Sequence, residues 1–210
     1  MEIAILIFDR LTALDAVGPY EVLSRLPDAR VSFVAKTPGL QRTENGMLAL
    51  NADLTLAELP HPEILVIPGG FGTRALTKDR EVTDWIRGAH ERSTWTTSVC
   101  TGALLLGAAG LLNGLEATTH WLMMDELPQY GATPVSRRIV QQGKLITSSG
   151  VASGIDMALT LAAEVAGPEW AQGIQLGIEY DPEPPFPGGS PRTSPAHIVD
   201  LVRARAAELA

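Results

Sequence analysis

Short apolar runs alternate with longer amphipathic or Ala/Leu-rich segments along most of the chain. Residues 2–8 (EIAILIF) and 64–67 (ILVI) are unbroken apolar runs, which are typical of central strands covered on both faces. Further strands are predicted at residues 31–36 and 115–120, at 47–50 after the turn signal Asn45-Gly46, and at 94–99, where β-branched and aromatic residues prevail. Residues 138–147 predict a hairpin around Gln142-Gly143. Helices are expected at residues 16–26, 79–90, 103–112, 121–127, 155–165, 168–179 and 195–209.

This alternation predicts the α/β class, with a doubly wound and mostly parallel sheet sandwiched by helices. The ligand site of such a sheet lies beyond the carboxyl ends of its strands. Residues 181–195 (DPEPPFPGGSPRTSP) are too rich in proline and glycine for regular structure. No linker or repeat divides the 210 residues, so we expect one domain over residues 1–210.

The composition narrows the class of partner. A formal net charge of −8, with Arg137-Arg138 as the only adjacent basic pair, argues against nucleic acids and anionic membranes. A single cysteine excludes an internal disulfide, and the amino terminus MEIAILIFDR does not resemble a signal peptide. No apolar run is long enough to span a bilayer. We therefore expect a cytoplasmic protein that acts on a small molecule.

The only cysteine, Cys100, lies where a β-branched run becomes an Ala/Leu/Gly-rich segment (STWTTSVCTGALLLGAAGLL). A strand that turns sharply into a helix presents the corner side chain beside unpaired N–H groups of the helix start. Gly102 matches the second glycine of a G-x-S-x-G elbow, and Ser98 stands in place of the first. We therefore interpret Cys100 as a nucleophile with a lowered thiol pKa, while a buried structural thiol is the alternative.

Asp15, in LTALDAVGPYEVL, lies in a loop that reaches the same edge of the predicted sheet as Cys100. Local sequence favours an N-cap role for this aspartate. Proximity to a thiolate, together with partial burial, would raise the pKa of its carboxyl and suit it to acid catalysis. Capping and catalysis are compatible, so both hypotheses stay open.

Two further loops are expected at this edge. Gly69 and Gly70, in PGGFG, either form an ordinary turn or let backbone N–H groups complete an oxyanion hole with the Thr101 amide. His120, in TTHW, is either the base of a Cys-His pair or a structural residue at a strand end. No H-x-x-x-H or H-E-x-x-H spacing occurs, so no metal site is predicted.

Several segments together resemble the ThiJ/PfpI superfamily, a class I glutamine amidotransferase-like domain. They are IAILIFDRLTALDAVGPYEVL, ILVIPGGFG, SVCTGALLLGAAGLLNG, ATTHW and ITSSGVASGIDMAL. Asp15, the pair Cys100-Thr101 and the tail EYDPEPPFPGGSP are similar to the isonitrile hydratase branch. Peptidase-type relatives carry histidine directly after the cysteine, where this chain has Thr101, and glyoxalase-like relatives usually carry glutamate at the acidic position.

The resemblance implies a flavodoxin-like sandwich and a homodimer with the site near the subunit interface. It implies a cysteine-dependent hydro-lyase that needs no metal or organic cofactor and adds water to an isonitrile to give an N-substituted formamide. Cys100 would be the nucleophile, Asp15 the acid and base, and Thr101 a further catalytic residue. Gly69, Gly70, Thr101 and His120 are expected to bind substrate or steady developing charge.

Two other functions are consistent with the same residues. One is a glyoxalase or deglycase, in which Cys100 attacks an aldehyde. The other is a ligand-sensing or redox-sensing module, whose cysteine is occupied or oxidised without turnover. The identity of the substrate does not follow from the sequence.

Overall fold

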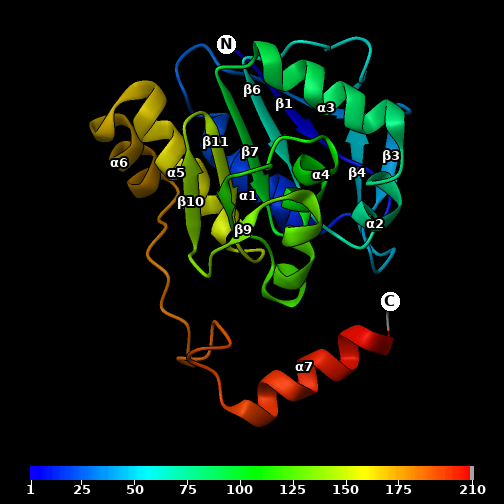
Figure 1. The fold of residues 1–210 in the computed structure, drawn as a ribbon. Coiled ribbons are helices and arrows are strands. Elements are labelled where there is room, and N and C mark those ends of the chain that lie inside the picture. The colour runs from blue at the N-terminus through cyan, green and yellow to red at the C-terminus, as the bar shows by residue number, and fades with distance from the viewer. Residues whose placement is uncertain (209–210) are drawn as a thin grey trace. The chain divides into compact units, whose positions relative to one another are not determined.

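A seven-stranded sheet with the order β10-β11-β7-β6-β1-β2-β5 lies at the centre of the computed structural model, which describes residues 1–208. Every pairing in this sheet is parallel except that of β10 with β11 (Figure 1). The strands are β1 (Glu2–Leu6), β2 (Arg30–Ala35), β5 (Leu54–Thr55), β6 (Ile64–Ile67), β7 (Trp95–Val99), β10 (Ile139–Gln142) and β11 (Leu145–Ser148). The parallel strands follow the flavodoxin-like order, as expected.

Two small sheets accompany the central one. One is the antiparallel pair β3 (Gly39–Arg42) and β4 (Ala49–Ala52), and the other is the parallel pair β8 (Glu116–Ala117) and β9 (Thr133–Pro134). The turn predicted at Asn45-Gly46 connects β3 to β4, and Gly46 has a φ of +71°. Strand β4 contacts β2 of the main sheet, and β8 contacts β10.

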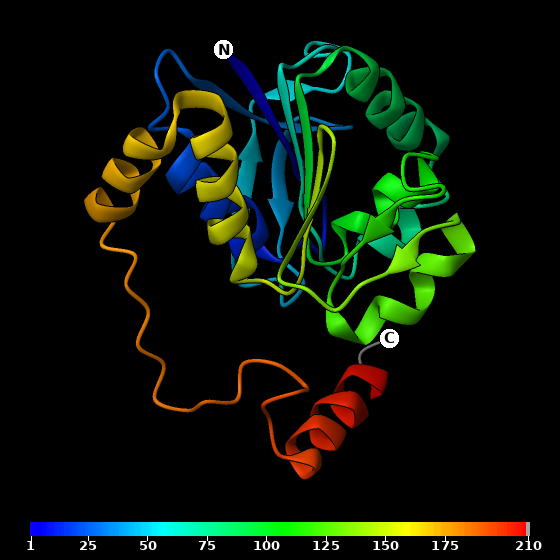
Figure 2. The same cartoon turned by 60° about the vertical axis from the view of Figure 1, so that its left-hand side comes forward.

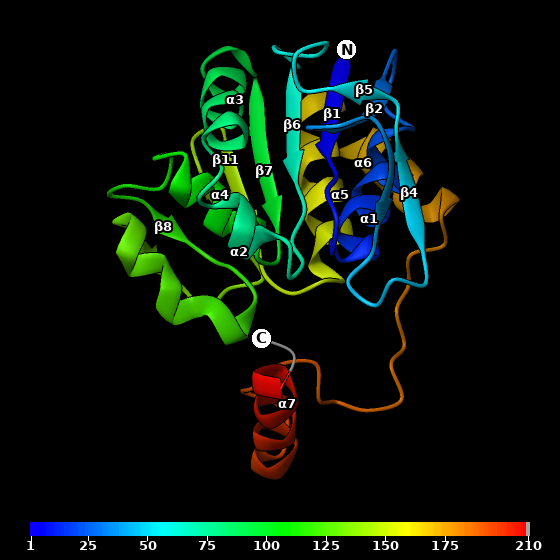
Figure 3. The same ribbon diagram turned by 90° about the vertical axis from the view of Figure 1, so that its right-hand side faces the viewer.

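Helices cover both faces of the central sheet. On one face lie α1 (Ala13–Leu23), α5 (Ser153–Ala166) and α6 (Pro168–Gly177), and on the other lie α2 (Thr73–Leu76), α3 (Arg80–Arg92) and α4 (Gly102–Ala108) (Figure 3). A 3-10 helix, η1 (Trp121–Tyr130), follows β8. Helices α1 and α5 lie side by side (Figure 2). Gly18 permits this approach, because a Cβ there would lie 3.1 Å from Ile155 Cγ1.

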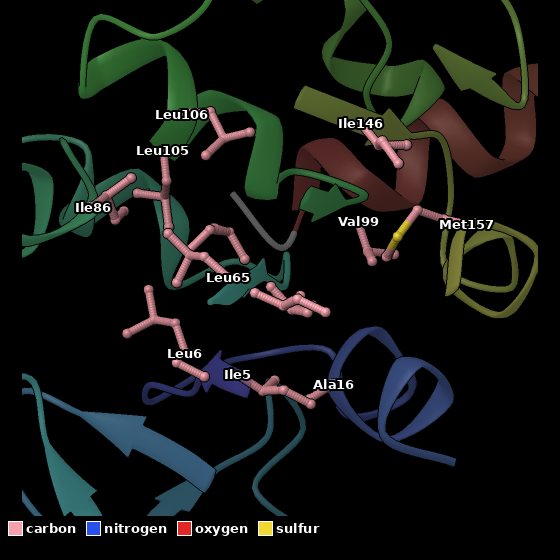
Figure 4. Packing of buried hydrophobic residues seen from close by; sticks show 14 of the residues in the cluster. Ile5, Leu6, Ala16, Leu65, Ile86, Val99, Leu105, Leu106, Ile146 and Met157 are labelled. Carbon is pink, nitrogen blue, oxygen red and sulfur yellow. The ribbon is translucent and has the colours of Figure 1, made fainter. Parts of the chain in front are cut away.

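The core forms on both sides of the strands, because successive residues of a strand point to opposite faces. Ile5 of β1 points toward Ala16 of α1, whereas Leu65, Leu105 and Ile86 gather on the side of α3 and α4 (Figure 4). All four residues of β6 are buried. The central strands therefore read as continuous apolar runs rather than as alternating ones.

The chain divides into two compact units, Met1–Ile178 and a second that begins at Glu179. The second contains a segment without helix or strand over residues 181–195, as predicted, and helix α7 (Ala196–Glu208). The predicted end of that helix at Leu209 lies outside the described residues. One domain over residues 1–210 stays a prediction. None of the helices described is both long enough and apolar enough to cross a membrane.

Several predicted elements have different bounds in the structure. The helix predicted at 16–26 begins earlier, at Ala13, and the one predicted at 103–112 ends at Ala108, shortly before Gly110 with its φ of +82°. The strand predicted at 115–120 is only Glu116–Ala117, and residues 121–127 belong to a 3-10 helix. The strand predicted at 47–50 is shifted to β4. Strands β3, β5 and β9 and helix α2 are too short for a pattern in the sequence to indicate them.

Candidate active site

Cys100 occupies the corner between β7 and α4, at the carboxyl edge of the sheet. Its φ is +57°, in the left-handed region that few residues other than glycine adopt. The backbone N–H of Cys100 donates to the carbonyl oxygens of Ser148 at 3.1 Å and Ser149 at 2.8 Å, which holds the corner against the end of β11. The structure therefore contains the sharp turn that the sequence predicts, with the strain typical of a nucleophile elbow.

Gly102, the first residue of α4, allows this corner to lie close to the neighbouring strand. A Cβ at this position would lie 2.0 Å from the carbonyl oxygen of Ile67, at the end of β6. No side chain fits there, so Gly102 has the close-approach role of the second elbow glycine. Ser98, in place of the first glycine, is buried, and its Oγ has no hydrogen-bond partner among residues 1–208.

Asp15 reaches the same corner from the first turn of α1. Its Oδ2 accepts a hydrogen bond from the backbone N–H of Gly69 at 2.9 Å, across a gap of 54 positions in the sequence. The N-cap position of α1 belongs instead to Thr12. The hypothesis that Asp15 is an N-cap is therefore wrong, because its carboxyl is turned away from its own helix and toward the glycine loop.

The carboxyl of Asp15 is fully buried, and burial raises its pKa from 3.8 to about 7. Burial and the charge of Glu44 raise this pKa, whereas hydrogen bonds from the Gly69 N–H and the Cys100 thiol lower it. The effect of burial is larger than that of the two hydrogen bonds. Although the thiol lies close enough to affect this pKa, Oδ1 is buried without a hydrogen bond of good geometry in the described part of the chain. An acid with a free oxygen can exchange its proton with a group that enters the site.

The pKa of the Cys100 thiol is raised rather than lowered, contrary to the expectation from the sequence. The thiol is 5 % exposed, and burial raises its pKa well above its usual 9, with a further increase from the nearby Asp15 carboxylate. The backbone N–H and the hydroxyl of Thr101 lower the pKa, but by less. The predicted lowered pKa is wrong for this structure, because burial of the thiol raises its pKa by more than the two donors of Thr101 lower it. The thiol consequently needs a base, and Asp15 is the ionisable side chain beside it.

Thr101 links the elbow to the glycine loop through its hydroxyl. Its Oγ1 accepts hydrogen bonds from the backbone N–H of Gly70 at 2.9 Å and from the hydroxyl of Thr73 at 3.2 Å. It also lies 3.2 Å from the carbonyl oxygen of Gly70, to which it can donate. The loop that holds Asp15 is thus fixed to the residue directly after the nucleophile.

The two glycine amides are occupied in this arrangement. Gly69 N–H is bound by Asp15 and Gly70 N–H by Thr101, so the oxyanion role expected for them stays a prediction. A Cβ on Gly69 would lie 2.5 Å from the Thr101 backbone nitrogen and 2.8 Å from Asp15 Oδ2. The missing side chain therefore lets the acid, the loop and the elbow meet. The Thr101 backbone N–H instead faces the Cys100 thiol and lowers its pKa.

His120 is the N-cap residue of η1, and its Nδ1 accepts a hydrogen bond from Leu122 N–H at 3.4 Å. Its ring lies 5.9 Å from that of Trp121, and burial lowers its pKa. No hydrogen bond joins it to Cys100 within residues 1–208, so the structural interpretation accounts for its contacts. The preceding residue, Thr119, touches the elbow instead, since its hydroxyl donates to the carbonyl oxygen of Cys100 at 2.8 Å.

Three residues that contact the site were not identified in the sequence. Thr73 and Thr119 are ordinary threonines whose hydroxyls support the elbow, and their only signal is proximity to PGGFG and TTHW. Glu44 hydrogen-bonds the hydroxyl of Thr12 at 3.2 Å. Nothing local in the sequence distinguishes Glu44 from other surface acids. Across residues 1–208, no group of three or more His, Cys, Asp or Glu side chains could hold a metal ion.

Comparison with known proteins identifies relatives of this chain in sequence and in fold. The model of the DJ-1/PfpI family matches residues 1–164. An isonitrile hydratase from Pseudomonas putida is 45% identical over 207 residues, which is 99% of this chain and 90% of that protein. A crystal structure of a ThiJ/PfpI family protein from Pseudomonas syringae has a TM-score of 0.95 at 38% identity, over 99% of this chain and 86% of that one. The structure of Drosophila melanogaster DJ-1beta, at 22% identity and a TM-score of 0.78, shares the fold over 85% of this chain and 97% of that one.

Proposed function

The chain belongs to the DJ-1/PfpI family, and we propose that it is an isonitrile hydratase, a hydro-lyase that converts an isonitrile and water into an N-substituted formamide. The observation that carries this proposal is the pairing of a buried cysteine with a buried acid whose pKa is about 7. The 45% identity to the Pseudomonas putida isonitrile hydratase, over nearly the whole chain, supports the same reaction.

The chemistry requires one nucleophile and one group that moves a proton. The terminal carbon of an isonitrile must gain a bond to a nucleophile and a bond to hydrogen before it can become a formyl carbon. Cys100 supplies the sulfur, and Asp15, ionised for about half of the time near its pKa, takes the thiol proton. Asp15 then delivers that proton to the isonitrile carbon as the C–S bond forms. The product of this step is a thioimidate on Cys100.

Water completes the reaction in a second step. Asp15 is again a carboxylate, and it accepts a proton from water as the oxygen attacks the thioimidate carbon. Asp15 passes this proton to the nitrogen of the substrate. As the C–S bond breaks, the hydroxyl proton of the tetrahedral intermediate moves through Asp15 to the sulfur, which releases the formamide and restores the thiol. The Thr101 N–H, which faces the sulfur, is placed to stabilise the thiolate as it leaves. No further base is needed, so His120 has no part in this scheme.

The test is the hydration of a simple alkyl isonitrile by the purified full chain, with the formamide identified by NMR. We expect stoichiometric N-alkylformamide. Methylglyoxal, assayed under the same conditions, distinguishes the glyoxalase alternative. Lactate from methylglyoxal without formamide from the isonitrile would overturn the proposal, and an absence of turnover with both substrates would favour a sensing module.

We also propose that the protein is a cytoplasmic homodimer. Helix α7 supports the dimer, because none of its residues is buried and its apolar side chains Ile198, Leu201 and Val202 are exposed. A helix with such a face is marginal by itself and is stabilised by a surface that covers it. Light scattering after size exclusion tests this point: twice the mass of one chain is expected, and the mass of a single chain would contradict it.

A further inference from the structure

Two arginines next to the active site contact the ring of one phenylalanine. The guanidinium carbon of Arg10 lies 5.6 Å from the centroid of the Phe71 ring, and that of Arg74 lies 5.3 Å from it. Both arginines are exposed, and Phe71 is half-buried. Stacking on an aromatic face fixes a guanidinium while its in-plane N–H donors stay available. Arg10 and Arg74 together form the arginine pair, and Phe71 is the ring that both of them contact.

The arginine pair has no carboxylate partner in the described structure. Among residues 1–208, the ion pairs of arginines involve Arg25, Arg30, Arg87, Arg137, Arg138 and Arg203. Two nearby acids are engaged elsewhere, since Asp9 Oδ1 accepts from the Arg42 backbone N–H and Glu44 Oε2 accepts from the Thr12 hydroxyl. Because neither arginine forms an ion pair in the described structure, their guanidinium N–H donors are available to an external anion.

The backbone connects the arginine pair directly to the catalytic corner. Phe71 follows Gly70, whose N–H is bound by Thr101 Oγ1. Arg10 has a φ of +64°, and its carbonyl oxygen accepts the N–H of Gly72 at 3.1 Å. A left-handed conformation costs a non-glycine residue about 1 kcal/mol, so the loop is held there by its contacts on both sides. The guanidinium groups are thus placed at the rim of the loop that holds Asp15.

We propose that Arg10 and Arg74 form a subsite for the carboxylate of an isonitrile substrate that carries one. This inference rests on the proposed function and specifies its substrate class: isonitriles with an acidic group on the substituent of the nitrogen. The isonitrile carbon reacts at Cys100 while the carboxylate is bound by guanidinium N–H donors. Both guanidinium groups contact the ring of Phe71, which fixes each of them relative to the loop that holds Asp15. Arginine suits this role because its planar fork matches the geometry of a carboxylate.

The test compares two isonitriles of similar size, an isocyano carboxylate and its methyl ester. For the wild-type protein, we expect a higher kcat/KM with the carboxylate than with the ester, and the preference should weaken at high salt. In Arg10→Gln and Arg74→Gln, the ratio of the two kcat/KM values should fall about tenfold each, the size of one charge-assisted hydrogen bond. Arg10→Lys, which keeps the charge but loses the fork, should give a smaller fall.

Arg92→Gln is the matched control. Arg92 is an exposed arginine at the end of α3, just before β7 begins at the opposite edge of the sheet, and its substitution should leave the ratio unchanged. A wild-type ratio at or below one, or equal ratios in all variants, would overturn the subsite while leaving the proposed function intact. Failure of the wild-type protein to hydrate either compound would overturn both.

Discussion

Asp15 and Gly69 are joined by a hydrogen bond of 2.9 Å from the glycine N–H to the carboxyl Oδ2. The bond fixes one oxygen of the acid and leaves Oδ1 buried and unpaired within the described structure. Because Gly69 also lies against the Thr101 backbone, the same contact sets the acid relative to the residue after the nucleophile. This contact explains how an acid on α1 and a thiol after β7 form one site.

The rate of isonitrile hydration should depend on pH through Asp15. Its pKa is raised to about 7, so the carboxylate that accepts the thiol proton is lost as the pH falls below 7. We expect kcat/KM to fall about tenfold per pH unit on the acid side. In Asp15→Asn, activity should fall by about 10²- to 10⁴-fold. The remaining activity should no longer show the decrease of kcat/KM below pH 7, the acid limb of the pH profile. An unchanged limb in this variant would assign the pKa to another group.

The stability of the protein should depend on pH for the same reason. The pKa of Asp15 is raised in the folded state. Its contribution to the free energy of unfolding is therefore fully present below pH 3.8 and is lost as the pH rises toward 7. The loss is at most about 4 kcal/mol, from 1.36 kcal/mol per pKa unit. Urea unfolding between pH 5 and 8 measures it against Asp15→Asn. The wild-type protein should lose more stability over this range than the variant, and parallel curves would contradict the burial effect.

Thr101→Val tests the hydroxyl that binds the glycine loop. The substitution keeps the Thr101 backbone N–H but leaves the Gly70 N–H without its acceptor, which costs about 1–3 kcal/mol. We expect about a tenfold lower kcat for isonitrile hydration, because the loop that positions Asp15 is released. Thr101→Ser, which retains the hydroxyl, is the control and should restore most of the rate. Equal rates in the two variants would show that the Thr101 hydroxyl does not position Asp15 for catalysis.

Gly102→Ala and Gly88→Ala form a matched pair that tests the elbow. A Cβ at position 102 would lie 2.0 Å from the Ile67 carbonyl oxygen, whereas a Cβ at position 88, inside α3, meets nothing within 4 Å. The first substitution should destabilise the protein by about 3 kcal/mol or more. The second should stabilise it by about 0.5–1 kcal/mol, because alanine is the better helix former. Thermal unfolding measures both, and a neutral Gly102→Ala would show that the elbow has room.

The sequence was most informative where physics is local. Apolar runs identified β1 and β6, a run of β-branched and aromatic residues identified β7, and the change of preference at Cys100 located the elbow. The role of Asp15 required the fold, because its partner Gly69 is far away in the chain and its own neighbourhood resembles an N-cap. The pKa of Cys100 was wrong in direction, since the sequence indicates the helix start but not the depth of burial. Arg10 and Arg74 meet only through Phe71, which no spacing pattern reveals.

The most direct test of the central claim is formamide formation from an alkyl isonitrile by the wild-type protein and by Cys100→Ala at pH 7.5. The variant should remain folded by circular dichroism, because alanine occupies less space than cysteine and keeps the backbone N–H that donates to Ser148 and Ser149. We expect steady production by the wild-type protein and a decrease of at least about 10³-fold in the variant, since covalent catalysis is lost. A variant that retains hydration within tenfold of the wild-type rate would contradict Cys100 as the nucleophile.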